Sequence, residues 1–311
     1  MPEEPLPTEE QVRGYLESCS NWGRWGPDDS AGTVNHVTPE KRREAAALVK
    51  TGRAVSISYP LNTVGGPGNW NPAQHFVRSL PDFSVDYIGL LFHGYATTHV
   101  DALCHIFWEG KMYNGKPATD VTPLGARSGS VDAWKTGITT RGVLIDIPRF
   151  RGEPYVTLER PVRAWEIEDA ALAQGTPLRP GDAVLVYSGR PAYFAANPAA
   201  VPGVAPSPGL HADTAPYLKG KDAAILGWDQ MDAAPSGYRI FPGLSVHVLT
   251  IVFMGMPLLD NAFLEPLAQA CEEEGRWEFL LTINPLHVRG GTGSPVNPVA
   301  FFTVSASSRM V

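Results

Sequence analysis

Three of the eight histidines in this chain, together with one aspartate, fall within the thirteen residues 93–105. His99 and Asp101 are two residues apart, so on an extended strand their side chains project from the same face. An imidazole and a carboxylate presented in this way can bind a divalent cation together. His105 follows four residues after Asp101 and can return to the same pocket. The alternative is a group of core residues, each of which would need a hydrogen-bond partner if buried.

A second candidate region contains His247 and Asp260. His247 lies in an apolar run that predicts a strand, where a histidine is often structural. Asp260 follows a Gly-Met-Pro turn that can aim a carboxylate into a cleft. Together with His99 and Asp101, these residues would complete a set of nitrogen and oxygen ligands. Such a set suits zinc, manganese or iron and disfavours a soft thiolate site.

The segment 284–295 contains a third motif, a cluster of three glycines that allows close approach of the backbone. It lacks the Gly-Lys-Ser/Thr ending of a phosphate-binding P-loop and the dinucleotide-binding fingerprint. We therefore expect it to close a pocket or to contact another subunit. The chain also contains no Gly-x-Ser-x-Gly and no His-Glu-x-x-His sequence, which argues against a serine hydrolase and an ordinary zinc protease.

The composition is that of a globular protein, with 43% hydrophobic and 18% charged residues. A net charge of −7 and a single short basic run at 41–43 argue against nucleic acid as a partner. The longest apolar run, 244–259, is too short and too polar to span a membrane, and no secretory signal is visible. Three widely spaced cysteines form no disulfide framework, so we expect a cytoplasmic location. We expect Cys104 to be a packing residue; a reactive thiol is the alternative.

Helix-start signals precede two N-terminal segments. Thr8 with Gln11 forms a capping-box pattern, and Thr38 followed by Pro39 predicts a helix from Glu40 to Lys50. Further helices are predicted at 164–174, 212–218 and 266–274. Strands are predicted at 54–59, 85–92, 142–147, 183–187, 223–227, 245–252, 278–283 and 299–304. The Gly/Pro-rich stretches 62–72 and 197–209 are expected to be long surface loops that form lids or rims.

These elements predict an α/β fold with a mixed sheet or barrel and few helices, rather than a regular βαβ repeat. We expect a single catalytic domain over 53–311, with residues 1–52 as a helical N-terminal arm. Within that arm, the segment 21–29 places Trp22 and Trp25 among glycines. It either packs on a neighbouring subunit or folds onto the core of its own chain.

The segment 98–105, Thr-His-Val-Asp-Ala-Leu-Cys-His, resembles the second half of a hallmark of the cyclase family, His-x-Gly-Thr-His-x-Asp-x-Pro-x-His. Leu103 stands in place of the hallmark proline. The family consists of metal-dependent hydrolases and includes bacterial kynurenine formamidase and isatin hydrolase. The segments 21–29, 107–115 and 291–298 resemble its longer subgroup. The resemblance implies the swivelling β/β/α fold of that family.

One position departs from the hallmark. Its first histidine would fall at position 95, where this chain has Tyr95. His93 would point to the same face if the strand is regular. Either His93 substitutes as a ligand, or the metal has fewer protein ligands, or Tyr95 turns the pocket to another use. We expect one divalent ion, Mn²⁺ or Zn²⁺, rather than two. Asp260 falls one residue away from a family glutamate or glutamine ligand, counted from His247.

The resemblance implies hydrolysis of an amide, cyclic amide, lactone or similar acyl bond in a small-molecule substrate. His99, Asp101 and Asp260 would hold a cation that activates water and polarises a carbonyl. His105 or His247 would transfer the proton, because imidazole titrates near neutrality. His93, Tyr95, Trp108, Tyr113 and Arg190 are the candidate substrate-binding residues. The candidate aromatic wall comprises Trp70, Phe92, Phe107, Trp108 and Tyr113, which core packing would also explain. Arg190 and Arg289 are candidates to hold a carboxylate; surface arginines without a specific role are the alternative.

Two other functions are compatible with the same residues. The pocket could serve ring closure, dehydration or isomerisation in secondary metabolism, since the replacement of a ligand by Tyr95 is compatible with altered chemistry. Alternatively, the chain could be a binding protein built on an enzyme scaffold. A homodimer or homotetramer is expected from the resemblance and from the tryptophan-rich arm.

Overall fold

The computed structural model describes residues 5–49 and 52–302. Its main sheet has nine strands in the order β1-β13-β11-β7-β8-β9-β10-β4-β12. These strands are β1 (Ala54–Ser56), β4 (His99–Asp101), β7 (Ile138–Asp146), β8 (Ala183–Tyr187), β9 (Ile225–Trp228), β10 (Leu258–Asp260), β11 (Glu278–Ile283), β12 (Gly293–Pro295) and β13 (Val299–Phe301). Two separate hairpins are formed by β2 (Gln74–Ser79) with β3 (Ser84–Gly89) and by β5 (Val121–Thr122) with β6 (Gly125–Ala126).

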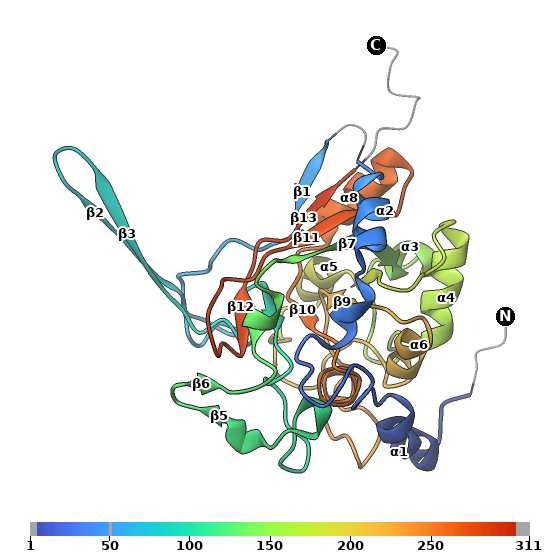
Figure 1. The fold of residues 1–311 in the computed structure, drawn as a ribbon. Coiled ribbons are helices and arrows are strands. Elements are labelled where there is room, and N and C mark those ends of the chain that lie inside the picture. Colours follow the sequence, from blue (N-terminus) through green and yellow to red (C-terminus); the bar gives the residue numbers. More distant parts are fainter. Residues whose placement is uncertain (1–4, 50–51, 303–311) are drawn as a thin grey trace.

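The centre of the sheet is parallel and its flanks are antiparallel. Strands β7, β8, β9 and β10 run in one direction, whereas β11, β13 and β1 on one side and β4 and β12 on the other pair antiparallel. The sheet curls into a half-barrel with helices against it (Figure 1). The expectation of a mixed α/β fold without a regular βαβ repeat is therefore confirmed.

Helices and short helical turns connect the strands. The α-helices are α1 (Glu9–Ser18), α2 (Pro39–Ala46), α3 (Ile147–Arg151), α4 (Ala164–Ala173), α5 (Arg190–Ala196), α6 (Thr214–Gly220), α7 (Ser245–His247) and α8 (Glu265–Glu274). The helix α7 continues directly into a π-helix, η5 (Val248–Met254). The 3₁₀ turns are η1 (Gly32–His36), η2 (Tyr113–Gly115), η3 (Ala118–Asp120) and η4 (Val131–Trp134).

The two predicted N-caps are present. Thr8 and Gln11 form the reciprocal capping box of α1, and the Thr38 side chain accepts from the Lys41 backbone at the start of α2. Helix α2 ends at Ala46 rather than at Lys50, which lies outside the described residues. Helices α4, α6 and α8 overlap the other three predicted helices, at 164–174, 212–218 and 266–274. The Gly/Pro-rich segments 62–72 and 197–209, which were predicted to be loops, contain no helix or strand.

Most predicted strands are present, but one is wrong. Predicted strands at 183–187 and 278–283 match β8 and β11 at both ends, and those at 54–59, 85–92, 142–147, 223–227 and 299–304 overlap observed strands. Positions 303–304 lie outside the described residues. The run 245–252 is helical instead. It is buried on every side, and periodicity alone cannot distinguish such a run from a buried strand.

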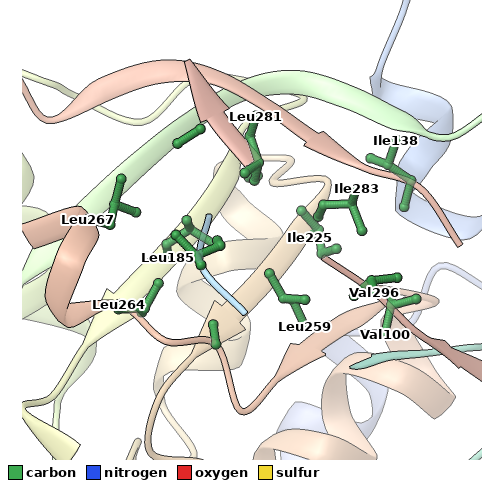
Figure 2. Packing of buried hydrophobic residues seen from close by; sticks show 14 of the residues in the cluster. Val100, Ile138, Leu185, Ile225, Leu259, Leu264, Leu267, Leu281, Ile283 and Val296 are labelled. Carbon is green, nitrogen blue, oxygen red and sulfur yellow. The ribbon is translucent and has the colours of Figure 1, made fainter. Parts of the chain in front are cut away.

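Alternation along the strands divides the buried side chains between two cores. Leu144, Leu185 and Leu259 belong to the core inside the curl, whereas Val143, Val184 and Leu258 belong to the opposite core. Figure 2 shows inner-core side chains from β4, β8, β9, β10 and β11 gathered together. The opposite core includes side chains from α1, α4, α6, α7 and η5, so those elements cover the other face of the sheet.

The tryptophan-rich segment contacts the core of its own chain. The Trp22 ring stacks on Phe253 with ring centroids 5.5 Å apart, and its indole N–H donates to the Val252 carbonyl. Asn21 donates to the Met254 carbonyl. These bonds satisfy carbonyl groups at the end of η5 that the helix leaves free. Of the two alternatives for residues 21–29, the structure therefore supports packing on the chain's own core.

The β2–β3 hairpin projects away from the rest of the molecule (Figure 1). Both of its faces expose apolar side chains, since Phe76 and Tyr87 lie opposite each other on one face while Val77 and Ile88 lie on the other. All four side chains are at least half exposed. No helix among the described residues is long and apolar enough to cross a lipid bilayer.

A buried ion cluster joins the N-terminal segment to the sheet. Asp182 accepts from Lys41 Nζ at 2.6 Å and from Arg141 Nη1 at 2.7 Å, and all three side chains are buried. We expect Asp182→Asn to lower the free energy of unfolding by about 3–5 kcal/mol, because two buried cations would then lack their common anion. Urea denaturation measures this loss. The matched change Glu168→Gln, in an exposed pair with Lys221, should cost less than about 1 kcal/mol; equal losses would contradict the prediction.

Candidate metal centre

Strand register brings the two predicted regions together. Strands β4 and β10 pair antiparallel, with Asp260 opposite His99 and Leu258 opposite Asp101. Directly opposed residues share a face, so these side chains all project toward the core that contains Leu258. Helix α7 covers that face and carries His247. The cluster therefore lies at the carboxyl end of the parallel strands, the edge at which open α/β sheets bind ligands.

Asp101 is the centre of the cluster. Its Oδ1 atom lies 2.9 Å from His93 Nδ1, 3.3 Å from His99 Nε2 and 3.8 Å from His105 Nε2. Its Oδ2 atom lies 3.9 Å from His247 Nε2. The Asp101 side chain is fully buried. Two groups of three potential ligands share this aspartate: His93, Asp101 and His105, and His99, Asp101 and Asp260.

These donor atoms fit a divalent cation. Neither Asp101 oxygen has a hydrogen-bond donor among the described residues, and His93 Nδ1, although 2.9 Å away, is not aligned for a hydrogen bond. Buried carboxylate oxygens without partners are costly. Two ligands about 2.1 Å from one ion and about 90–110° apart are separated by roughly 3.0–3.4 Å. The His93–Asp101 and His99–Asp101 separations lie in or close to that range.

His99 is oriented as a metal-ligating histidine would be. Its Nδ1 lies 2.8 Å from the Thr97 carbonyl, which leaves Nε2 facing Asp101. Burial would by itself lower the pKa of His99, but Asp101 and Asp260 outweigh it and raise the pKa to about 9. Burial likewise would raise the pKa of Asp101, whereas the surrounding imidazoles hold it well below its usual range. The carboxylates of the cluster thus favour positive charge at His99.

His247 is held between two carboxylates. Its Nδ1 contacts Asp232, and its Nε2 lies 3.2 Å from Asp260 Oδ2. Asp232 also accepts from the backbone N–H groups of Val246 and His247, so one carboxylate caps α7 and orients the imidazole. Burial alone would lower the pKa of His247, but Asp232 and Asp260 hold it well above its ordinary value. Sequence analysis missed Asp232, which lies in the loop that follows the predicted strand 223–227.

Asp260 contacts three other members of the site. Its Oδ1 accepts from the Trp228 indole N–H, and its Oδ2 lies 3.2 Å from His247 and 4.0 Å from His99. The Trp228 bond leaves the Oδ2 atom directed at the histidines. Trp228 ends β9 on the same face, and sequence analysis did not select it. The predicted grouping of His99, Asp101 and Asp260 is present; their role as ligands stays a prediction.

His93 lies beside Asp101, the centre of the cluster. Backbone bends at 93–97 replace the regular strand that was expected, and they bring His93 Nδ1 to Asp101. The His93 ring stacks on His105 with centroids 3.7 Å apart and planes 4° apart. Its Nε2 lies 3.1 Å from Thr292 Oγ1 in the glycine-rich segment. That segment therefore packs beside the cluster, and Arg289 is exposed at its edge.

Arg190 does not have the free guanidinium that was expected to hold a carboxylate. It is buried, donating to the Asp229 carbonyl, the Asn261 side chain and the Tyr95 carbonyl. Asn261 donates in turn to the carbonyls of Gly94 and Thr97. The expected carboxylate-binding role is corrected to a positioning role, because these bonds hold the bent segment 94–97 beside the cluster.

The residues of the predicted aromatic wall do not form one surface. Trp70 and Phe92 line a hollow beside His93 and Tyr95, which we call the cluster hollow. Tyr113 belongs to the inner core instead, and its hydroxyl donates to Asp29. Trp108 packs against Phe241 in the opposite core, with ring centroids 5.3 Å apart, while Phe107 is partly exposed. Tyr113 and Trp108 are therefore corrected to packing residues.

Cys104 is a packing residue, as expected. It is fully buried in the inner core, and burial raises the pKa of its thiol to about 12. A thiol with so high a pKa is almost entirely protonated at neutral pH, so it is unreactive and a poor metal ligand. The metal centre among the described residues therefore offers only nitrogen and oxygen donors.

Comparison with known proteins agrees with this fold. Residues 40–235 match the Cyclase family, described as "Putative cyclase". A crystal structure described as a novel cyclase is 27% identical, with a TM-score of 0.77 over 91% of this chain and 99% of its own.

Isatin hydrolase A from Labrenzia aggregata, in complex with benzyl benzoate, is 18% identical. Its TM-score is 0.55 over 83% of this chain and 96% of its own. An isatin hydrolase bound to the product analogue thioisatinate is also 18% identical, with a TM-score of 0.54 over 82% and 93%. These two likenesses concern the fold. Comparison with curated proteins gives no match. The chain belongs to the cyclase family.

Proposed function

We propose that this protein is a metal-dependent hydrolase that cleaves an amide, cyclic amide or lactone bond in a small, ring-bearing molecule. The observation that carries the proposal is Asp101, a fully buried carboxylate that four imidazoles surround within 3.9 Å. It has no hydrogen-bond donor in the part of the chain that the structure describes. Membership of a family with a hydrolase fold supports it.

The ligands that we propose are His99, Asp101 and Asp260, with His93 in place of the missing hallmark histidine. A single divalent ion, Mn²⁺ or Zn²⁺, suits this nitrogen and oxygen set. When bound, such an ion supplies a Lewis acid that activates water and polarises a carbonyl oxygen. The remaining requirement is a group in the chain that accepts the water proton and returns it to the leaving atom.

We propose His105 for that proton transfer. Its side chain is 26% exposed, whereas that of His247 is 5% exposed and enclosed by Asp232 and Asp260. The His105 ring is therefore more accessible to a substrate than the His247 ring. His247 in this arrangement orients Asp260 through its Nε2. We thus propose that both histidines contribute to catalysis. His105 transfers the proton, and His247 acts indirectly by orienting Asp260.

The test is hydrolysis by the Mn²⁺- or Zn²⁺-loaded full chain against a panel of N-acyl amides, cyclic amides and lactones. Reaction in ¹⁸O-labelled water should place label in the product acid, which ring closure, dehydration and isomerisation do not require. The Asp86→Asn protein, altered on the exposed hairpin, serves as the matched control. Metal-loaded protein that turns over no panel member, or that forms unlabelled product, would count against the proposal.

We also propose that the protein works as a homodimer or homotetramer in the cytoplasm. The β2–β3 hairpin supports the first point, because an isolated two-stranded ribbon with apolar side chains exposed on both faces is marginally stable in water. Light scattering should therefore give a mass of two or four chains, and a monomer would contradict the prediction. Three buried free cysteines suit the reducing cytoplasm.

A further inference from the structure

A second hollow, separate from the metal centre, lies where β7 ends. Strands β8 and β9 separate β7 from β10, which carries Asp260. Helices α3 and α4, which lie side by side (Figure 1), supply most of the wall, and Trp277 completes it. We call it the Asp146 hollow, after the last residue of β7. It holds about 500 Å³ of space and opens to solvent, and that volume is typical of small-molecule sites.

Asp146 gives the hollow a carboxylate that lacks a cation. Its side chain is 8% exposed, and its Oδ1 atom accepts from the Arg149 backbone N–H at 3.0 Å, which caps α3. Its Oδ2 atom accepts from no group among the residues that the structure describes, and solvent can reach it. The nearby Arg149 guanidinium pairs with Glu272 instead. A mostly buried carboxylate without a cation is costly, so a positively charged ligand would stabilise it.

The other polar side chains of the wall already have partners. Arg149 Nη1 donates to Glu272 Oε1 at 2.7 Å, and its guanidinium lies 4.9 Å from the centre of the Trp277 ring. With the Gln174 amide oriented so that its oxygen faces Trp277, the indole N–H donates to that oxygen at 2.8 Å. The amide nitrogen then donates to a backbone carbonyl of α4 at 3.1 Å. Among the described residues, Asp146 Oδ2 is therefore the side-chain acceptor of this wall that lacks a donor.

The charge and the apolar wall of the hollow favour an organic cation. Burial raises the pKa of Asp146, and the Arg149 backbone N–H and guanidinium offset this only in part. The rings of Phe150 and Trp277 supply apolar surface beside the carboxylate. An ammonium group offers N–H donors to Oδ2 while its carbon body packs on the rings. A bare divalent metal ion would find too few ligands there, because one carboxylate oxygen is all that the wall leaves unpaired.

We propose that the Asp146 hollow binds a small primary amine with an apolar or aromatic body, whose ammonium group donates to Asp146 Oδ2. The body of the amine packs against Phe150 and Trp277. The inference stands apart from the proposed function, because none of the proposed metal ligands or proton-transfer residues lines this hollow. It gives the end of β7 a ligand site of its own.

The experiment measures binding of benzylamine to the full chain by ligand-observed NMR, with benzyl alcohol as the matched neutral compound. A mildly alkaline buffer keeps the carboxylate ionised and the amine protonated. Asp146→Asn removes the charge and keeps a side-chain oxygen that can cap α3. Asp169→Asn makes the same chemical change in α4, outside the wall of the hollow, and serves as its control.

A second pair of variants tests the space in the hollow. Ala173→Trp places a large ring in the wall, whereas Leu172→Trp adds the same ring at the adjacent position, outside the wall. Both positions are exposed, so neither change disturbs the core. Thermal unfolding of all four variants establishes that the fold is retained.

We expect benzylamine to bind the parent more tightly than benzyl alcohol does. Asp146→Asn should weaken benzylamine binding about tenfold, as the loss of one charge-assisted hydrogen bond predicts, and Ala173→Trp should abolish it. The two controls should bind as the parent does. The inference is overturned if the parent does not bind benzylamine, if benzyl alcohol binds as tightly, or if either Asp146→Asn or Ala173→Trp binds benzylamine as well as the parent does. A protein that shows the expected binding but hydrolyses nothing would contradict the proposed function alone.

Discussion

Asp101→Asn should weaken binding of Mn²⁺ or Zn²⁺ by roughly a thousandfold or more. Asparagine keeps the size of the side chain and removes the one negative charge that His93, His99, His105 and His247 surround. Both groups of potential ligands contain this residue, so no alternative trio remains intact. Metal content after dialysis and titration calorimetry with each metal measure the loss. Hydrolytic activity should disappear with the metal.

The control for this prediction is Asp86→Asn. Asp86 is exposed on the β2–β3 hairpin, where it forms an ion pair with His75. The same chemical change there should leave metal affinity within about twofold. Circular dichroism and thermal unfolding of both variants establish that the fold is retained. If the Asp101→Asn protein binds metal as tightly as the parent, the cation site has been assigned to the wrong residues.

His105→Phe should lower the turnover rate by roughly a hundredfold to ten-thousandfold while most of the bound metal is kept, as expected of a lost proton-transfer group. Phenylalanine preserves a ring that can stack on His93, whose centroid lies 3.7 Å away, and it deletes both imidazole nitrogens. The variant thus separates proton transfer from packing. The readouts are the rate with the best substrate of the panel and the metal content of the same sample.

His105→Ala provides the companion test, because the smaller side chain leaves room for added imidazole. Partial recovery of the rate by imidazole is expected, and it should depend on the imidazole concentration. His75→Phe, on the exposed hairpin, is the matched control and should leave the rate unchanged. Loss of the metal together with the rate in His105→Phe would instead identify His105 as a ligand in the group formed by His93, Asp101 and His105.

Much of the fold and half of the site could be predicted from local sequence. The spacing of His99 and Asp101 determines that they share a face of a strand, because side chains alternate with a period of two. Capping residues Thr8 and Thr38 determine where two helices begin, since a side-chain oxygen there satisfies a backbone N–H group. These features depend on neighbours in sequence, and the structure confirms them.

The rest depends on contacts between distant residues, and only the tertiary structure decides it. Whether 245–252 forms a strand or a helix is decided by burial on all sides and by Asp232, which caps α7. The Arg190 guanidinium donates within the chain because β9 and β10 end beside it. The residues that follow these strands, Asp229 and Asn261, accept its hydrogen bonds. Strand pairing alone places Asp260 opposite His99, across a sequence separation that spacing cannot bridge. The sequence thus determines which types of candidate ligand are present, and the pairing of the strands brings them together.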